Sequence, residues 1–270
     1  MSATNTSSST ELPALGPTPP GYQRRLPPTF DSVEEERDYR KRELAIAFRV
    51  FAKLGFGEGV AGHITVRDPG NPDHFWVNPF GVSFAQITKA DLLLVDQGGN
   101  LLEGTRPVNP AAFAVHSQVH EARPDVTAAA HAHTVYGKAF ASLGIHLEPI
   151  NEDACVFFED HALYDFRGVP GEMDGGSTLG GALGSNKALI LQNHGLLTTG
   201  ESVAEAVWWF VAMERACQVQ LLAMAAGDPK PVDRGTALKT RGQMGNHMAG
   251  WYQARPIWDD MARSDPDLFA

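Results

Sequence analysis

Cysteine is scarce in this sequence, because only Cys155 and Cys217 occur in 270 residues. Two thiols are too few for a disulfide framework or for a zinc site built from several cysteines. Their number is typical of a protein from the reducing cytoplasm. We expect both to be small buried apolar residues, since nothing around either one marks an activated nucleophile.

Long apolar runs and an excess of positive charge are also missing. The chain contains no apolar stretch of about 20 residues, the length that crosses a membrane, and it does not begin with a cationic segment followed by an apolar one. Its 22 Lys and Arg are outnumbered by 32 Asp and Glu. Nucleic acids and anionic membranes are bound mainly through Lys and Arg, so we expect neither as a partner. A cytoplasmic protein that acts on a small molecule is the expectation.

The residues that are present divide the chain into three parts. Residues 1–30 combine Ser, Thr and Pro with few large apolar groups, and we expect a flexible N-terminal arm. Residues 31–230 have the length and composition of one α/β domain. Residues 231–270 are interpreted as a C-terminal extension, either a partly ordered tail or an arm that packs on a neighbouring subunit.

Helix and strand patterns alternate along the domain. Ser32 and Glu35 form a capping sequence for a helix that ends near Leu54. The later segments are predicted strands at 61–68, 74–79, 91–96 and 127–133, helices at 109–125, 134–144 and 201–227, and a buried strand within 187–200 that turns at Gly195. This alternation predicts a layered α/β/α domain.

Two histidines end the apolar segment "TAAAHAHTVYG" (127–137). His131 and His133 are two residues apart, so on a strand they share one face at a separation of about 7 Å. That separation allows both imidazoles to bind one metal ion. Alternating histidines also occur on solvated strand faces, but the small apolar residues before this pair favour a buried one.

A third histidine at the end of another apolar segment completes a candidate metal site. His194 stands in "LILQNHGLLTTG", where Gly195 allows the backbone to turn sharply. Three imidazoles with an open position are typical of a catalytic site. The alternative is a turn histidine that bonds to backbone. The spacing of His116 and His120 on a mostly buried helix is more typical of supporting residues than of further ligands.

Four stretches of the chain resemble a known family in their order and spacing. They are "EGVAGHITVRD", "WVNPFGVSFAQITKADLLLVD", "HSQVHEARPDVTAAAHAHT" and "ALILQNHGLLTTGESVAEAVWW", and together they are similar to the class II aldolase/adducin family over about residues 35–227. The resemblance implies a three-layer α/β/α sandwich around a mainly antiparallel sheet, assembled as a homotetramer with sites between subunits. It also implies one divalent metal ion per subunit, zinc, iron or manganese, held by His131, His133 and His194.

The sequence departs from the family's aldolases at the acid/base. Those enzymes carry a Glu that acts as acid/base and as a metal ligand, preceded by two serines. The corresponding residues here are Ala112, Pro110 and Ala111. We expect His63 or His116 to move the proton that the missing Glu would move.

The phosphate pocket of the family is altered as well. Its polar elements are replaced by "AGH" (61–63) and "PFG" (79–81), which offer few groups to a phosphate dianion. We therefore expect the substrate to be an unphosphorylated acid. An aromatic acid would match this more apolar pocket best. The residues predicted to contact it are Phe80, Gly81, Phe84 and Tyr252, whereas Trp76 is predicted to pack in the core.

Three functions remain open from the sequence. The first is a metal-dependent lyase, a decarboxylase or retro-aldol enzyme for a hydroxy- or keto-acid, because loss of CO2 needs no base to start it. The second is a non-heme Fe(II) oxygenase acting on an aryl acid, for which Glu152, Asp153 and Asp160 are nearby carboxylates in sequence. The third is a non-catalytic, adducin-like module, which loss of the Glu favours and the retained histidines disfavour.

Overall fold

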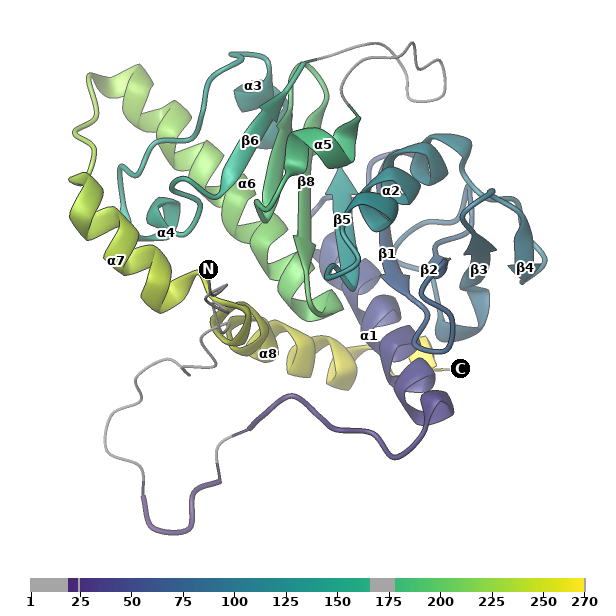
Figure 1. The fold of residues 1–270 in the computed structure, drawn as a ribbon. Helices are drawn as coiled ribbons and strands as arrows, with labels where there is room; N and C mark the ends of the chain where they lie inside the picture. Colours follow the sequence, from purple (N-terminus) through teal and green to yellow (C-terminus); the bar gives the residue numbers. More distant parts are fainter. Residues whose placement is uncertain (1–18, 24, 166–177, 270) are drawn as a thin grey trace, which may run out of the picture.

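One sheet organises the computed structural model, which describes residues 19–23, 25–165 and 178–269 (Figure 1). The described residues form eight strands in the order β4-β3-β2-β1-β5-β8-β7-β6. The pair β6–β7 is parallel and the other neighbouring pairs are antiparallel. The strands are β1 (His63–Arg67), β2 (His74–Val77), β3 (Leu93–Asp96), β4 (Leu101–Glu103), β5 (Ala128–Ala132), β6 (His161–Tyr164), β7 (Ala188–Leu191) and β8 (Gly195–Gly200).

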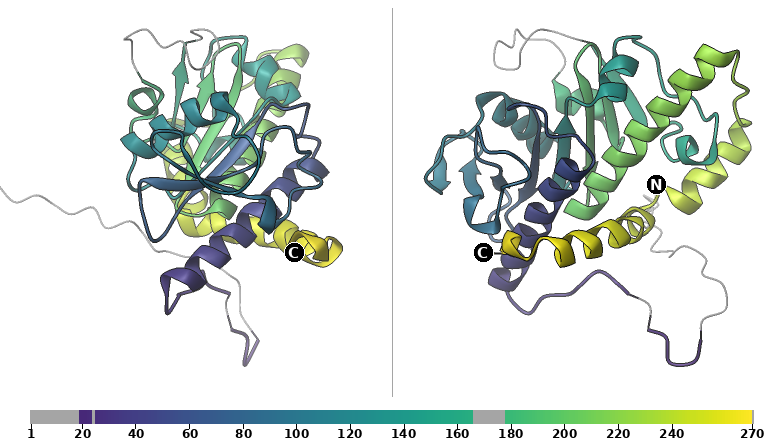
Figure 2. Two further views of the ribbon diagram at one scale, coloured as in Figure 1. Left: turned by 90° about the vertical axis from the view of Figure 1, so that its right-hand side faces the viewer. Right: turned by 180° about the vertical axis from the view of Figure 1, so that it is seen from behind.

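Helices cover both faces of this sheet, so the predicted three-layer α/β/α sandwich with a mainly antiparallel sheet is confirmed (Figures 1 and 2). Helices α2 (Pro110–Ala122) and α5 (Leu179–Leu183) lie on one face, and α1 (Val33–Lys53), α3 (Val135–Ala141) and α6 (Val203–Ala226) lie on the other. The remaining helical segments are α4 (Glu152–Cys155), α7 (Arg234–Met244), α8 (His247–Ser264) and the 3₁₀ turns η1 (Lys89–Asp91) and η2 (Pro266–Phe269).

The period of two along each strand assigns side chains to the two faces. Ile64 lies opposite Ala130 in the register of β1 and β5, and both belong to the larger core under α1 and α6. Thr65 lies opposite Ala129 and faces the other way, where Ala129 packs with the apolar side of α2. The alanines of β5 are small, so helices can approach this central strand closely from both sides.

The predicted capping sequences begin the two longest helices. The Ser32 hydroxyl accepts a hydrogen bond from the Glu35 amide at 3.1 Å, and the Ser202 hydroxyl accepts one from the Glu205 amide at 3.2 Å. Each bond satisfies an amide that the first turn leaves without a partner. The first helix ends at Lys53, before Gly55, which has a φ of 76° and adopts it without strain.

The C-terminal extension is helical and packs on its own domain. Helix α8 lies across α6 and α1, where it buries Trp251 and Trp258 in the main core (Figure 2). Arg255 forms a buried ion pair with Glu43 of α1, with 3.0 Å between Nη2 and Oε2. Packing of this extension on a neighbouring subunit stays a prediction.

Part of the predicted N-terminal arm, residues 1–18 and 24, lies outside the described residues. Within the described part, the Arg25 guanidinium pairs with Asp259 of α8 at 2.7 Å, and the Phe30 ring lies 5.1 Å from the Tyr39 ring. The last residues of the predicted arm are therefore in contact with α1 and α8.

Both cysteines match their expectation. Cys155 and Cys217 are buried and unpaired, and burial raises the pKa of each thiol. None of the described helices has both the length and the apolar character of a membrane-spanning segment.

Two leucines in helices test how the core stabilises this fold. Leu44 of α1 is fully buried, whereas Leu222 of α6 is 60% exposed. We expect Leu44→Ala to lower the free energy of unfolding by about 2–5 kcal/mol, because it leaves a cavity. Leu222→Ala should change it by less than about 0.5 kcal/mol in chemical denaturation. Equal effects of the two substitutions would contradict this assignment of the core.

Candidate metal centre

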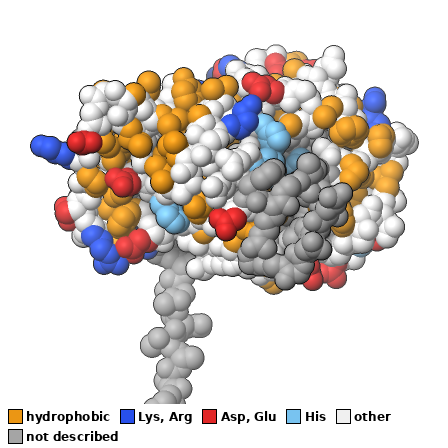
Figure 3. Space-filling model, turned by 90° about the horizontal axis from the view of Figure 1, so that it is seen from above, with side chains coloured by type: hydrophobic (Ala, Val, Ile, Leu, Met, Phe, Trp, Pro, Cys, Tyr) orange, Lys and Arg blue, Asp and Glu red, His pale blue; other side chains and the backbone are white. Residues whose placement is uncertain are grey.

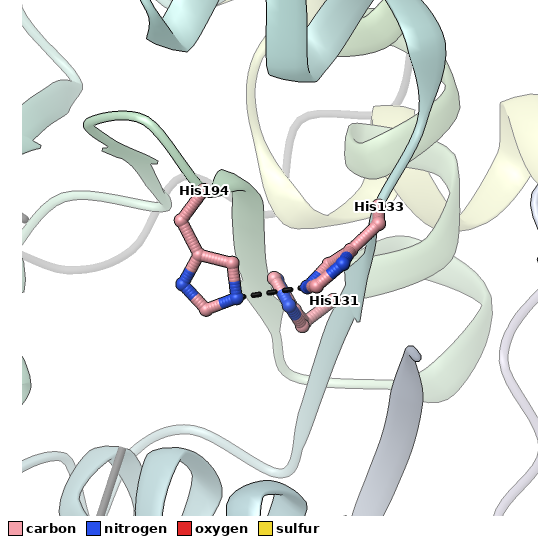
Figure 4. Close-up of side chains that lie close together, drawn as sticks. All are labelled: His131, His133 and His194. Carbon is pink, nitrogen blue, oxygen red and sulfur yellow. Dashed lines mark hydrogen bonds between the residues drawn. The ribbon is translucent and has the colours of Figure 1, made fainter. Parts of the chain in front are cut away.

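The three predicted metal ligands converge at one end of the central strands. His131 is on β5, His133 follows the last residue of that strand, and His194 precedes β8. Because β5 and β8 are antiparallel neighbours, with Ala132 opposite Leu196, the end of one strand lies beside the start of the other. One nitrogen from each histidine lies within 4.8 Å of the others, and the Nε2 atoms of His133 and His194 are 2.8 Å apart (Figure 4).

Two local details differ from the sequence prediction. His133 lies just beyond the strand rather than within it. The turn before β8 is made by residues 192–194, and the left-handed residue is Asn193, with a φ of 55°. The prediction that the chain turns at Gly195 is therefore wrong. Gly195 is needed for close approach instead, because a Cβ atom there would lie 3.1 Å from the carbonyl oxygen of Ala132.

Hydrogen bonding fixes which nitrogen of His131 is free. Its Nδ1 lies 2.7 Å from the carbonyl oxygen of Leu196. A carbonyl only accepts, so Nδ1 carries the proton and the lone pair of Nε2 is left for a ligand bond. The backbone of β8 thus sets the tautomer of a residue on β5.

Burial keeps the three imidazoles neutral at pH 7. It places the pKa of His131 well below 6.5 and lowers the pKa of His133. Burial and then His133 lower the pKa of His194 to about 4. Neutral imidazoles are the form that binds metal, and such a set suits zinc or iron. The donor set and its spacing therefore fit a divalent ion.

Two more buried histidines adjoin the triad. His63 lies directly opposite His131 in the register of β1 and β5, and its ring centroid is 5.0 Å from that of His131 and 4.7 Å from that of His116 on α2. Within the described part of the chain, His63 Nδ1 and His116 Nε2 are buried and have no hydrogen-bond partner. Such atoms are rare in folded proteins, and a bound water or ligand is one way of satisfying them. Seen from above, histidine side chains reach the surface at this end of the molecule (Figure 3).

A threonine that sequence reasoning missed supports this pair. The Thr65 hydroxyl lies 2.6 Å from His116 Nδ1 and 2.9 Å from His120 Nε2. A hydroxyl has one proton, so Thr65 donates to one ring and accepts from the other. The available signal was its position two residues after His63, on the same face of the strand.

The predicted substrate-contacting residues fall in three different places. Phe80 is 40% exposed and Gly81 has a φ of 78°. Both lie in the turn after β2, at the end of the sheet where His63 begins β1. Phe84 lies in the core, with its ring centroid 4.9 Å from that of Phe48, and its contact with substrate stays a prediction. Tyr252 is on α8, at the opposite end of the sheet from the triad (Figure 1).

The other candidates are also placed. Trp76 is buried in the core, as expected. Asp160, a carboxylate considered for an iron site, pairs instead with Lys187 at 3.1 Å. Ala111 and Ala112 lie in the first turn of α2, and their side chains are outside the described part of the structure.

Comparison with known proteins identifies the family. The family described as "Class II Aldolase and Adducin N-terminal domain" matches residues 42–221, which is most of the domain. The chain belongs to the class II aldolase/adducin family. A solved member of this family, "L-fuculose 1-phosphate aldolase from Glaciozyma antarctica PI12", is 45% identical, with a TM-score of 0.83 over 90% of this chain and 96% of its own.

Two curated relatives of the class II aldolase/adducin family are about equally similar to the chain. A Streptomyces niveus protein named "Decarboxylase NovR" is 46% identical over 247 residues, which are 90% of this chain and 92% of its own. A protein from Streptomyces roseochromogenus subsp. oscitans, named "4-hydroxy-3-prenylphenylpyruvate oxygenase/4-hydroxy-3-prenylbenzoate synthase", is 45% identical over 249 residues, which are 91% and 90% of the two chains.

The buried histidines predict how stability depends on pH. Burial lowers the pKa of His120 from 6.5 to about 3, so on acidification the unfolded chain binds a proton at this residue before the folded chain does. As the pH falls from 6.5 to about 3, each such histidine should lower the free energy of unfolding by about 1.4 kcal/mol per pH unit. Above pH 6.5 its contribution is constant. His120→Phe should therefore reduce the slope between pH 6 and 4 in urea titrations. An unchanged slope would show that His120 is not buried in its neutral form.

Proposed function

We propose that this protein is a metal-dependent lyase that cleaves a carbon–carbon bond in an unphosphorylated, aromatic hydroxy- or keto-acid, most simply by decarboxylation. The supporting observation is the neutral triad of His131, His133 and His194 beside two buried histidines with unpartnered nitrogens. The proposal includes one divalent ion per subunit and a homotetramer, as the family resemblance implies, and a cytoplasmic location, which the scarcity of cysteine favours.

A divalent ion held by the triad would supply a Lewis acid that withdraws electrons from substrate oxygens. In an acid whose carbonyl is β to the carboxylate, loss of CO2 leaves the bonding pair on the α carbon. The pair delocalises onto the carbonyl oxygen as an enolate, and a proton from water then replaces the carboxylate on that carbon. This order of events requires no base to begin. It therefore suits a chain with alanine at position 112.

His63 and His116 are the groups best placed to handle the substrate and that proton. Burial holds the pKa of both well below 6.5, so each is neutral and can donate one hydrogen bond and accept another. If Thr65 donates to His116 Nδ1, then His116 Nε2 is a donor toward the site. His63 and His116 can hydrogen-bond a substrate oxygen and relay a proton from water, and neither ring has to become a stable imidazolium.

The aromatic character of the substrate is supported by two observations. Phe80 is partly exposed in the turn after β2, at the end of the sheet where His63 begins β1. This turn replaces polar groups of the family's phosphate pocket. One relative is named for an aryl-pyruvate, 4-hydroxy-3-prenylphenylpyruvate, which is an unphosphorylated keto-acid. An aromatic ring packs well against such a surface.

An Fe(II) oxygenase is the second candidate function. The relative named as an oxygenase is almost as similar to the chain as the relative named as a decarboxylase. Imidazole ligands with open positions suit iron as well as zinc. A non-catalytic module is disfavoured, because it would give the assembled triad no role.

Metal content and oxygen dependence separate these candidates. We expect the purified protein to contain about one divalent ion per subunit by elemental analysis, and His131→Ala to lose it together with turnover. A lyase should release CO2 or an aldehyde from aryl keto- and hydroxy-acids in an anaerobic chamber. Bound iron together with turnover that strictly requires O2 would establish the oxygenase. Absence of turnover in the wild type, with no change in any property on His131→Ala, would establish the non-catalytic module.

The roles of His63 and His116 are tested separately from metal binding. We expect His63→Ala and His116→Ala to keep the metal and to lower kcat by about 10²–10⁴-fold, the range for a lost proton-transfer group. Elemental analysis and steady-state kinetics provide the two readouts. Activity within a few-fold of the wild type would remove both residues from the mechanism.

A further inference from the structure

A buried carboxylate holds the backbone that follows His133. Glu214 lies in the middle of α6 and is 2% exposed. Its carboxylate accepts hydrogen bonds from the Thr134 hydroxyl at 2.5 Å, the Tyr136 amide at 3.1 Å and the Gly137 amide at 2.6 Å. All three donors belong to the first turn of α3 or to the residue before it.

This arrangement replaces the usual cap of α3. Thr134 is at the N-cap position, but its side chain makes no cap bond to its own helix. Its hydroxyl points to Glu214, which caps the helix from another element. Gly137 makes this approach possible, because a Cβ atom there would lie 2.7 Å from Thr134 Oγ1 and 2.9 Å from Glu214 Oε2.

His133 therefore lies between two fixed points of the chain. On one side, Ala132 pairs with Leu196 as the last residue of β5. On the other side, Thr134 is bonded to Glu214. His133 itself has no strand pairing in β5, so these neighbours fix the backbone from which its imidazole extends.

The partners of the Glu214 carboxylate are all neutral donors. Within the described residues, no Lys or Arg forms an ion pair with this carboxylate. Its donors are a hydroxyl and two amides, which are neutral. Its hydrogen bonds to residues 134–137 are therefore the contacts through which Glu214 can act on the ligand segment.

We propose that Glu214 is a positioning residue that sets metal affinity by fixing the segment 134–137 and, through it, His133. This inference rests on the proposed metal site. Partners that orient ligands typically change metal affinity by about 10–100-fold when they are removed.

The same helix provides a matched control. Glu205 is 3% exposed and also accepts three hydrogen bonds, from the Glu201 amide at 2.8 Å, the Trp209 indole at 2.9 Å and His247 Nδ1 at 2.8 Å. It lies about 13 Å from Glu214 along the helix. It lines a cavity with Thr127, before the start of β5, at the other end of the sheet.

The experiment compares Glu214→Gln, Glu205→Gln and Thr134→Val with the wild-type chain. Metal affinity is measured with Zn²⁺ in competition with a chromogenic chelator, and the ligand geometry is followed by the visible spectrum of the Co²⁺ form. The melting temperature of each metal-free protein reports the purely structural effect. Thr134→Val removes one hydrogen bond with little change in shape, so it decides the question if Glu214→Gln does not fold.

We expect Glu214→Gln to weaken Zn²⁺ binding at least about 10-fold and to alter the Co²⁺ spectrum. Thr134→Val should weaken binding by a smaller factor. Glu205→Gln should lower the melting temperature but leave the affinity within twofold of the wild type.

Three results overturn the inference. Wild-type affinity in Glu214→Gln, or in Thr134→Val if the former does not fold, removes the positioning role. An equal loss of affinity in Glu205→Gln shows a general effect of destabilisation. Failure of the metal site itself looks different: the wild type binds no Zn²⁺, or His131→Ala binds it as tightly, and the inference then falls with the proposed function.

Discussion

The antiparallel pairing of β5 with β1 on one side and β8 on the other is the constraint on which the site depends. It puts His63 directly opposite His131 and brings the end of β5 beside the start of β8, where His194 lies. A slip of one residue in either register would turn these side chains to the opposite face of the sheet. The alanine side chains of β5 are small, so helices can pack closely on both faces of this strand. The backbone hydrogen bonds among β1, β5 and β8 therefore determine where these histidines lie.

Burial determines the chemical state of that cluster. Six of the ten histidines of the chain lie in it, namely His63, His116, His120, His131, His133 and His194. Removing imidazolium from water is costly, so the fold keeps these rings neutral and their hydrogen bonds select tautomers. The Leu196 carbonyl directs the free lone pair of His131, and Thr65 links His116 to His120. Under the proposed function, the same burial leaves neutral triad nitrogens free for a metal ion and leaves His63 and His116 able to exchange hydrogen bonds with a substrate.

Helix α6 joins the two ends of the sheet through two buried carboxylates. Glu205, in the first turn of α6, accepts a hydrogen bond from His247 of α8. Glu214, in the middle of α6, accepts hydrogen bonds from Thr134 and Gly137, which follow His133. Buried carboxylates are tolerated only where several donors surround them, and each of these accepts three hydrogen bonds. The scaffold behind the site is consequently held by directional bonds as well as by the apolar core.

Much of this could be read from the sequence, since short-range patterns carry it. The capping residues Ser32 and Ser202, the alternating histidines His131 and His133 and the order of the family motifs predicted the helices, the layered fold and the triad. Contacts between distant segments could not be predicted in this way. Phe84 is close in sequence to Phe80 and Gly81, yet it packs against Phe48. The turn before β8 has Asn193 in the left-handed conformation, and Gly195 passes close to Ala132. Local sequence determines which residues form a strand or helix, whereas the partner of Thr65 or Glu214 is decided only when strands and helices far apart in the chain are packed together.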